Sequence, residues 1–135
     1  VTHTALVTAE VLARIRTATP TPFRILVADL LLFFRDSYRE VFNFEHPPLH
    51  DPCAVAFVIA PALFDTTPLR VDVETKSELS AGQTVCDIWR QSGKPSNVSV
   101  ATRMDVGAFW DLFLNAMSKA DAKAGPLLKQ FSTKN

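Results

Sequence analysis

The sequence predicts a helix-rich chain of mixed α and β structure with a few short strands. Apolar residues recur at helical spacing before residue 43 and after residue 105, whereas between residues 69 and 102 they alternate with polar residues over short runs. A doubly wound parallel sheet needs several strands that read as continuous runs of Val, Ile and Leu, and the sequence does not supply them. The fold is therefore either a small α+β domain or part of one whose main strands belong to sequence outside these 135 residues.

Two helices are expected before residue 43. A polar start at Thr8, followed by apolar residues three and four apart, predicts a short helix that ends before Pro20. Residues 19–22 alternate Thr with Pro and predict a turn. From residue 23 to about 41 the apolar residues first lie on several faces and then share the segment with charges, which predicts a helix that is buried early and amphipathic late.

A third helix is expected from Pro52 to about Ala60, after a loop that contains two consecutive prolines. Pro52 suits the first helical turn, where its missing N–H costs nothing. Asp51 suits the N-cap before it, where a carboxylate meets the positive end of the helix dipole. A helix cap beside a histidine at the rim is thus one interpretation of His50 and Asp51, and a functional site is the other.

The strands are expected in the following third of the chain. Strict alternation over residues 69–74 predicts a strand with one wet face, and residues 84–89 predict its partner across a turn at 80–83. After a loop with Gly and Pro, residues 98–102 predict another strand.

The last helix is expected to begin after Asp105, a favourable N-cap, and to carry a wide apolar stripe as far as Met117. Beyond Asp121 the apolar pattern is lost. Residues 122–135 are therefore expected to form a poorly ordered tail.

Charge and composition exclude several classes of function. The chain has 14 basic and 14 acidic side chains, so it offers no electrostatic surface for nucleic acid or for an anionic membrane. No apolar run is long enough to span a membrane, and the N-terminus does not resemble a signal peptide. Cys53 and Cys86 lack the spacing of a disulfide framework or a zinc site, which indicates a reducing, cytoplasmic location.

Several segments, taken in order, resemble the C-terminal part of the inosine-uridine preferring nucleoside hydrolases. They are residues 1–6 (VTHTAL), 50–56 (HDPCAVA), 71–74 (VDVE), 82–85 (GQTV) and 100–110 (VATRMDVGAFW). The His-Asp-Pro segment is the specific one. The resemblance implies an α/β fold, with residues 1–135 forming the C-terminal portion of an open Rossmann-like nucleoside hydrolase domain. The start at Val1 rather than Met agrees with a fragment.

The family's reaction is hydrolysis of the N-glycosidic bond of a ribonucleoside to ribose and free base, with a calcium ion that holds the ribose hydroxyls and the attacking water. The resemblance implies that Asp51 is a calcium ligand and that His50 is the proton donor to the departing base. Both assignments agree with general chemistry, because calcium takes hard oxygen ligands and a protonated base leaves more readily. A histidine can supply that proton near neutral pH.

Tyr38 and Phe34 are the candidate substrate-binding residues. They lie four residues apart and would share one face of the second helix. In the family this region is a mobile helix and loop over the pocket, and an aromatic residue at the position of Tyr38 contacts the base or assists its release. An aromatic pair at helical spacing is also typical of a core, but the charged neighbours of Tyr38 favour exposure.

Two parts of the family's site have no counterpart in the chain. These are the aspartate cluster Asp-Thr-Asp-Pro-Gly-x-Asp-Asp and the asparagine and glutamate that contact the ribose. Because calcium needs six to eight oxygen ligands, the others are expected from missing N-terminal sequence, and the chain alone is expected to be inactive.

The expected partners are a ribonucleoside substrate and further copies of the complete protein, as a dimer or tetramer, with neither nucleic acid nor membrane. The sequence does not indicate whether the base is a purine or a pyrimidine. Two alternatives stay open. One is a truncated, non-catalytic relative that serves as a subunit or binding module. The other is an α+β domain in which Asp51 only caps a helix.

Overall fold

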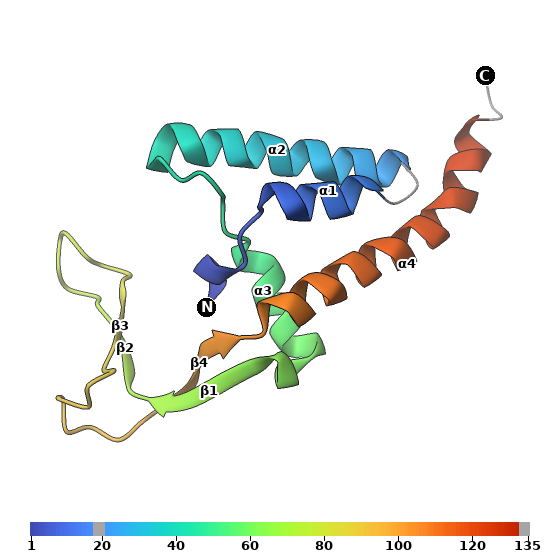
Figure 1. The fold of residues 1–135 in the computed structure, drawn as a ribbon. Coiled ribbons are helices and arrows are strands. Elements are labelled where there is room, and N and C mark those ends of the chain that lie inside the picture. The colour runs from blue at the N-terminus through green and yellow to red at the C-terminus, as the bar shows by residue number, and fades with distance from the viewer. Residues whose placement is uncertain (18–20, 133–135) are drawn as a thin grey trace. The chain divides into compact units, whose positions relative to one another are not determined.

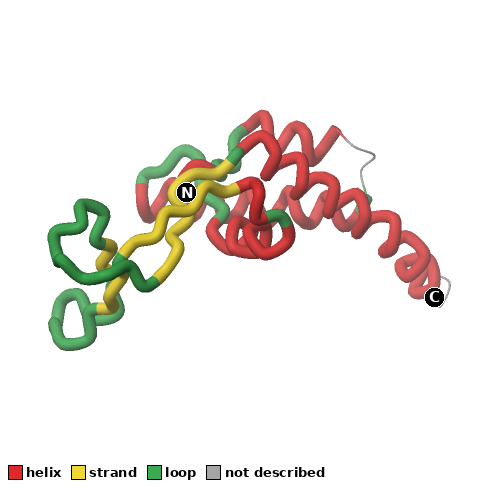
Figure 2. Tube along the Cα trace, turned by 90° about the horizontal axis from the view of Figure 1, so that it is seen from below, coloured by secondary structure: helices red, strands yellow, loops and turns green. Residues whose placement is uncertain are grey.

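Helices and strands occupy separate parts of the chain in the computed structural model, which describes residues 1–17 and 21–132 (Figure 1). Two compact units are present, one formed by Val1–Leu63 with Asp105–Asn135 and the other by Phe64–Met104. Figure 2 shows that the first unit is largely helical and the second consists of strands and loops. The elements in chain order are η1 (Thr2–Thr4), α1 (Ala9–Thr17), α2 (Pro22–Phe42), α3 (His50–Ile59), η2 (Pro61–Leu63), β1 (Phe64–Leu69), β2 (Val71–Val73), β3 (Thr84–Cys86), β4 (Val98–Met104) and α4 (Val106–Ser132).

The first two helices begin at side-chain caps. The Thr8 hydroxyl oxygen accepts a hydrogen bond from the N–H of Val11 (3.2 Å) before α1. The Thr21 hydroxyl oxygen accepts one from the N–H of Arg24 (3.1 Å) before α2, whose first residue is Pro22. Both predicted helices are confirmed in their extent. The expected early burial of the second helix is wrong, because Ile25 and Leu26 are 51% and 56% exposed. The first two residues of the predicted turn at 19–22 lie outside the described residues.

Helix α2 ends where the chain reverses direction at Asn43. This residue has φ 56°, a left-handed conformation that Asn tolerates better than most residues. The N–H of Asn43 donates to the carbonyl oxygen of Arg39 (3.1 Å) and the N–H of Phe44 to that of Tyr38 (3.4 Å). The reversal returns Phe44 to the last turns of α2.

Helix α3 begins at His50, so the prediction that Asp51 is its N-cap is wrong. Leu49 occupies the N-cap and offers no side-chain hydrogen bond. The start of the helix is set by backbone pairing. The N–H of Val7 donates to the carbonyl oxygen of Pro47 and the N–H of Leu49 donates to that of Ala5, each at a distance of 3.0 Å. That extended pairing ends at Leu49, and the helix follows directly. Asp51 instead lies in the first turn, where it still faces the positive end of the helix dipole.

A buried ion pair joins three helices of the first unit. Arg24 of α2 is only 6% exposed, and its Nε donates to Asp121 of α4 over 2.5 Å. The rest of its guanidinium donates to the Ser118 hydroxyl (2.8 Å) and to the carbonyl oxygen of Ile15 at the end of α1 (3.4 Å). Such extensive pairing is what allows a charged group to remain in a core.

The second unit consists of two antiparallel strand pairs. β2 pairs with β3 and places Val71 opposite Cys86, which confirms the predicted hairpin over a shorter length than expected. β4 contains the third predicted strand and pairs with β1, with a register shift between Asp65 and Thr66. β1 was not predicted, because Pro68 and two adjacent threonines obscure its alternation.

The last helix begins as predicted, since the Asp105 carboxylate accepts a hydrogen bond from the N–H of Ala108 (3.0 Å). α4 runs to Ser132, and the last three residues of the expected tail lie outside the described residues. The order of that tail in solution stays a prediction. None of the described helices has both the length and the apolar character needed to cross a membrane. The predicted helix-rich chain with a few short strands is confirmed.

Candidate active site

His50 is the first residue of α3 and is half-buried. Its Nδ1 lies 2.8 Å from the hydroxyl oxygen of Thr2, a residue of η1. The pairing of residues 5–7 with residues 47–49 brings η1 to the beginning of α3, although 48 positions separate Thr2 from His50. Among the described residues no hydrogen-bond partner is found for the second ring nitrogen, Nε2.

His3 lies between His50 and the end of α2. Its ring centroid is 5.3 Å from that of His50, with an interplanar angle of 62°, and 6.1 Å from that of Phe44, with an angle of 80°. Both are edge contacts of the kind that aromatic rings prefer. His46, the third histidine, is different, because its Nδ1 is buried without a hydrogen-bond partner in the described part of the chain.

Tyr38 is the centre of an aromatic cluster at the C-terminal end of α2. Its ring centroid lies 4.5 Å from Phe34, 5.0 Å from Phe42 and 6.3 Å from Phe44. Tyr38 and Phe34 are half-buried, so they combine packing with partial exposure, and their assignment as substrate-binding residues stays a prediction. Together with His3 and His50, these rings form one continuous aromatic series, which connects three of the four predicted site residues.

Asp51, the fourth predicted residue, is exposed on the first turn of α3. Its neighbourhood does not make a calcium site, because the described residues contain no group of three or more His, Cys, Asp or Glu side chains that could hold a metal ion. A single carboxylate does not fit an ion that takes six to eight oxygens. Asp51 lies at the rim of an apolar cavity of about 370 Å³ between α3 and α4, which is otherwise lined by Pro52, Val55, Ala56, Ile59, Phe109, Leu112, Phe113 and Ala116.

Cys53, one turn after His50, is not suited to nucleophilic chemistry. The thiol is 2% exposed and donates a hydrogen bond to the carbonyl oxygen of Leu49 (3.0 Å). Burial raises the pKa of the Cys53 thiol, which keeps it protonated. It behaves as a small apolar residue that holds the first turn of α3.

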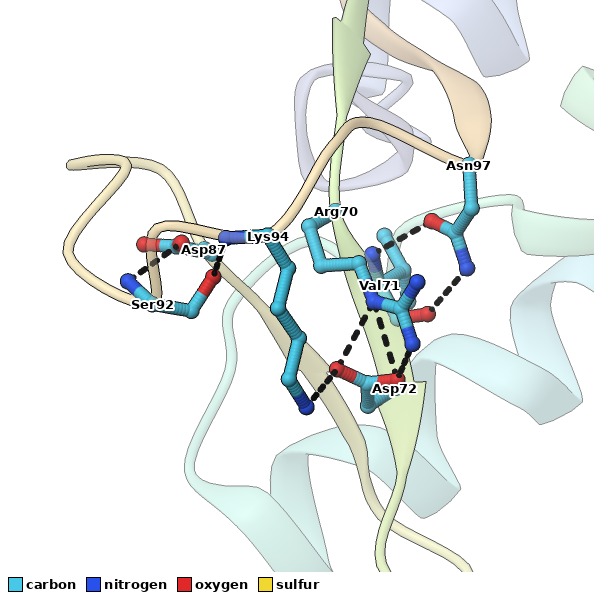
Figure 3. A network of polar contacts seen from close by, with 7 residues as sticks. All are labelled: Arg70, Val71, Asp72, Asp87, Ser92, Lys94 and Asn97. Carbon is cyan, nitrogen blue, oxygen red and sulfur yellow. Dashed lines mark hydrogen bonds and ion pairs between the residues drawn. The ribbon is translucent and has the colours of Figure 1, made fainter.

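The second unit has a polar cavity of about 350 Å³, lined in part by Arg70, Asp87, Arg90 and Lys94. Figure 3 shows the polar contacts of Arg70, Asp87 and Lys94. Arg70 binds the Asp72 carboxylate, with its Nε at 3.0 Å from both oxygens. Lys94 Nζ lies 3.8 Å from Asp72 Oδ2. The hydrogen bonds from Arg70 hold the pKa of Asp72 below its usual range.

Two side chains hold the loops around this cavity. Asn97 both donates to and accepts from the backbone of Val71, over 2.8 Å each way (Figure 3). Asp87 accepts hydrogen bonds from the N–H groups of Gln91 (2.8 Å) and Ser92 (2.9 Å). Hydrogen bonds from Ser92, then from Gln91, hold the pKa of Asp87 below its usual range. These contacts shape the loops, and none of the predicted site residues belongs to this unit.

Four residues in or beside the aromatic series were not predicted as site residues. They are Thr2, His3, Phe42 and Phe44. The first two lie in the VTHTAL segment, which contributed to the family resemblance without any role for its side chains. Their contacts with His50 depend on the pairing of residues 5–7 with 47–49. Neither periodicity nor a short motif reveals such a long-range pairing.

Sequence comparison gives one family and many relatives. The profile of the family described as inosine-uridine preferring nucleoside hydrolase matches residues 1–111. A probable ribonucleoside hydrolase of Dictyostelium discoideum is 45% identical over 120 residues, which cover 85% of this chain and 35% of that protein. A pyrimidine-specific ribonucleoside hydrolase, RihA, of Shewanella sp. (strain MR-4) is 42% identical over 119 residues, which cover 87% of this chain and 37% of that protein. The chain thus spans little more than a third of the length of these relatives.

Comparison with solved structures also matches the chain to about a third of the length of nucleoside hydrolases. The purine-preferring ribonucleoside hydrolase from Gardnerella vaginalis matches with a TM-score of 0.70 and 27% identity, over 87% of this chain and 37% of that one. The plant nucleoside hydrolase PpNRh1 matches in fold, with a TM-score of 0.69 and 19% identity over 87% of this chain and 38% of that one. The helix-rich arrangement therefore corresponds to a portion of a larger α/β fold, and a separate small α+β domain is not favoured.

Proposed function

The chain belongs to the inosine-uridine preferring nucleoside hydrolase family, and on that premise we propose that it is the C-terminal portion of a ribonucleoside hydrolase domain. The complete enzyme would hydrolyse the N-glycosidic bond of purine or pyrimidine ribonucleosides to ribose and free base. Its products would return to purine and pyrimidine salvage.

The placement of His50 is the observation that carries this proposal. The ring is half-buried, Nδ1 has a hydroxyl partner at 2.8 Å, and Nε2 has no hydrogen-bond partner among the described residues. Such a ring can donate a proton from Nε2 to a nitrogen of the departing base. As the bond to the sugar breaks, an oxocarbenium-like charge develops on the ribose and electrons move to the base, where a proton stabilises them.

Asp51 is proposed as one carboxylate ligand of the family's calcium ion. An exposed carboxylate next to His50 can reach the sugar side of a bound nucleoside while the imidazole reaches the base. The remaining ligands would come from N-terminal sequence outside these residues. This division between neighbouring side chains explains why the pair occupies the first turn of an otherwise apolar helix.

The aromatic series is proposed to contact the base. Tyr38 and Phe34 offer half-buried rings, and a flat base stacks favourably on an aromatic face. Stacking does not distinguish purines from pyrimidines. The relatives also differ, since the Shewanella protein is named pyrimidine-specific and the Gardnerella protein purine-preferring. Both classes of base therefore stay in the proposal.

The location and the assembly are proposals as well. The two cysteines are free, which supports a reducing compartment such as the cytoplasm. A homo-oligomer, either a dimer or a tetramer, would cover part of the apolar surface that the helices expose.

The test is release of base from uridine and inosine by the complete protein in the presence of calcium. The Asp51→Asn variant should lose activity by about a hundredfold or more, because a neutral amide binds calcium less well than a carboxylate. Asp65→Asn is the matched control, since this exposed aspartate pairs with Arg103 in the other unit and should have no effect on activity. Equal turnover by Asp51→Asn and the unmodified protein would refute the assignment.

The alternative is a non-catalytic subunit or binding module. It is supported by one observation, namely that the described residues contain no group of three or more His, Cys, Asp or Glu side chains that could hold a metal ion. The same assay separates the two proposals. Turnover of either nucleoside by the complete protein eliminates the alternative, and folded, calcium-loaded protein without turnover supports it.

A further inference from the structure

Thr2 makes the only polar contact to the ring of His50 within the described residues, and the structure gives it a role that the family match does not assign. Thr2 Oγ1 lies 2.8 Å from His50 Nδ1. We propose that Thr2 is a positioning residue, whose hydroxyl holds Nδ1 so that Nε2 is the nitrogen that donates the proton to the departing base. This inference rests on the proposed function, in which His50 is the acid.

The backbone fixes Thr2 relative to His50. The carbonyl oxygen of Thr2 accepts a hydrogen bond from the N–H of Ala5 (3.0 Å), and the carbonyl oxygen of Ala5 accepts one from the N–H of Leu49 (3.0 Å). Leu49 directly precedes His50, so two consecutive hydrogen bonds connect the residues. Ala5 and Leu49 are both buried, which protects these bonds from competition with water. The hydroxyl is therefore presented to the ring by a stable framework.

A hydroxyl at Nδ1 suits both protonation states that an acid must visit. In the imidazolium, Nδ1–H donates to Thr2 Oγ1 and Nε2–H faces the base. When the Nε2 proton moves to a nitrogen of the departing base, the ring becomes neutral and retains Nδ1–H, so its bond to Thr2 is unchanged. The attacking water loses a proton as it adds to the sugar, and a proton from solvent then restores Nε2–H, so the cycle balances. No group moves during transfer, and the hydroxyl carries no charge that would bind the proton too tightly.

His3 limits the ring of His50 from a second direction. The two ring centroids are 5.3 Å apart in an edge arrangement, and the ring of His3 also makes an edge contact with Phe44. A hydrogen bond at one nitrogen and a ring edge together oppose rotation about the side-chain bonds of His50. Thr2 supplies the directional part of this restraint, which is the part that a substitution can remove cleanly.

The experiment compares two leaving groups in the complete protein. Uridine needs its base protonated, whereas a nitrophenyl riboside releases a stable phenolate that needs no acid. Thr2→Val deletes the hydroxyl and preserves the shape of the side chain. It should lower kcat for uridine by about tenfold to a hundredfold, leave KM nearly constant and leave kcat for the nitrophenyl riboside unchanged. Thr2→Ser restores a hydroxyl and should recover kcat for uridine.

Thr4→Val is the matched control. Thr4 belongs to the same 3₁₀ helix, and its hydroxyl donates to the carbonyl oxygen of Val1 (2.7 Å) instead of to a histidine. Its removal should leave both substrates unaffected. Equal losses for both substrates in Thr2→Val would mean a purely structural role for the hydroxyl and would overturn the inference. So would failure of Thr2→Ser to recover uridine turnover.

A His50→Gln variant separates this inference from the proposed function. If His50→Gln loses uridine turnover selectively but Thr2→Val does not, the positioning role fails and the acid assignment stands. If His50→Gln affects both substrates equally, the acid assignment itself fails. The nitrogen NMR resonance of His50 Nδ1 adds a readout that needs no turnover. It should shift in Thr2→Val and return in Thr2→Ser, and a constant resonance would contradict the contact.

Discussion

Individual residues at the beginning of α3 have different environments within one helical turn. His50 is half-buried with a hydroxyl at one nitrogen, Asp51 is exposed, and Cys53 is buried with its thiol bound to Leu49. Only the first two can meet a ligand. The aromatic rings that continue from His50 to Tyr38 extend this surface to α2.

Tyr38 gives a prediction at this scale. Tyr38→Ala should raise KM for uridine and inosine by about tenfold, which corresponds to the roughly 1–3 kcal/mol of stacking between a base and an aromatic ring. Tyr38→Phe keeps the ring and should leave KM within about twofold if stacking is the contribution.

Phe33→Ala is a control on the same helix, because Phe33 is 74% exposed and has no ring contact with Tyr38 among the described residues. Steady-state kinetics of the three variants would check the prediction. An equal change of KM in Phe33→Ala and Tyr38→Ala would contradict a specific role for Tyr38.

The sequence predicts those site residues whose contacts are close along the chain, and misses those whose contacts join distant segments. His50 and Asp51 are adjacent and belong to a specific motif, so their importance was predicted. The expected N-cap at Asp51 was wrong, because the pairing of Leu49 with Ala5 sets the helix start, and a local pattern does not contain that pairing. Thr2 and His3 were missed for the same reason.

Secondary-structure elements depend on contacts between helices as well as on their own patterns. Helices α1, α2 and α4 meet at the buried pair of Arg24 and Asp121, whose side chains are 7% and 13% exposed. The predicted helices followed from periodicity, from the polar start at Thr8 and from the N-cap at Asp105. The cap at Thr21 was not predicted, because this residue lies in the predicted turn. Arg24 looked like an interruption of the apolar pattern, since the partner that neutralises it lies 97 residues away.

Breaking this pair should destabilise the protein strongly. Asp121→Ala leaves Arg24 charged and buried, so the free energy of unfolding should fall by about 3–5 kcal/mol. Asp111→Ala is the control on the same helix. The side chains of Asp111 and its partner Arg14 are 66% and 41% exposed, and loss of such an exposed pair costs roughly 0–1 kcal/mol. Urea unfolding of both variants in the complete protein would measure the difference. Comparable losses would contradict the account of the pair.

The loop after β3 gives a prediction for pH. Because Asp87 has its pKa lowered in the folded protein, its hydrogen bonds stabilise the loop fully above the ordinary pKa of 3.8. This stability is lost as the pH falls through the lowered folded value. The amide resonances of Gln91 and Ser92 should therefore stay constant from neutral pH to about pH 4 and change only in stronger acid.

The Asp87→Asn variant should show the loosened loop already at neutral pH, because an amide accepts weaker hydrogen bonds than a carboxylate. A loop that loosens at a pH well above the ordinary pKa, or an unaltered loop in Asp87→Asn, would contradict this assignment.

Strand β1 shows the limit of the sequence patterns. Its pairing with β4 defines it as a strand, but Pro68 interrupts the pattern by which a strand is predicted.

At the scale of the whole molecule, the described residues include many large apolar side chains that are exposed. On α3, Val55, Val58 and Ile59 are 57%, 81% and 65% exposed. This helix is apolar on nearly every side, which is typical of a helix inside a larger core. The chain spans little more than a third of the length of its relatives, so further sequence is available to cover this helix in the proposed complete protein.

The 135 residues expressed alone should therefore aggregate or form a molten state. Exposed apolar faces on α2 and α3 would bind a hydrophobic dye, and near-ultraviolet circular dichroism would be weak. A calorimetric scan that shows a sharp, cooperative unfolding transition would contradict this expectation, because it would mean that these faces need no further cover.

The proposed function depends most on the role of His50 as the acid for the departing base. The most direct test is the ratio of kcat/KM for inosine to that for a nitrophenyl riboside, measured in the complete protein and in its His50→Gln variant. This ratio should fall by about a hundredfold or more in the variant, because only inosine needs the proton. An unchanged ratio would contradict this role of His50.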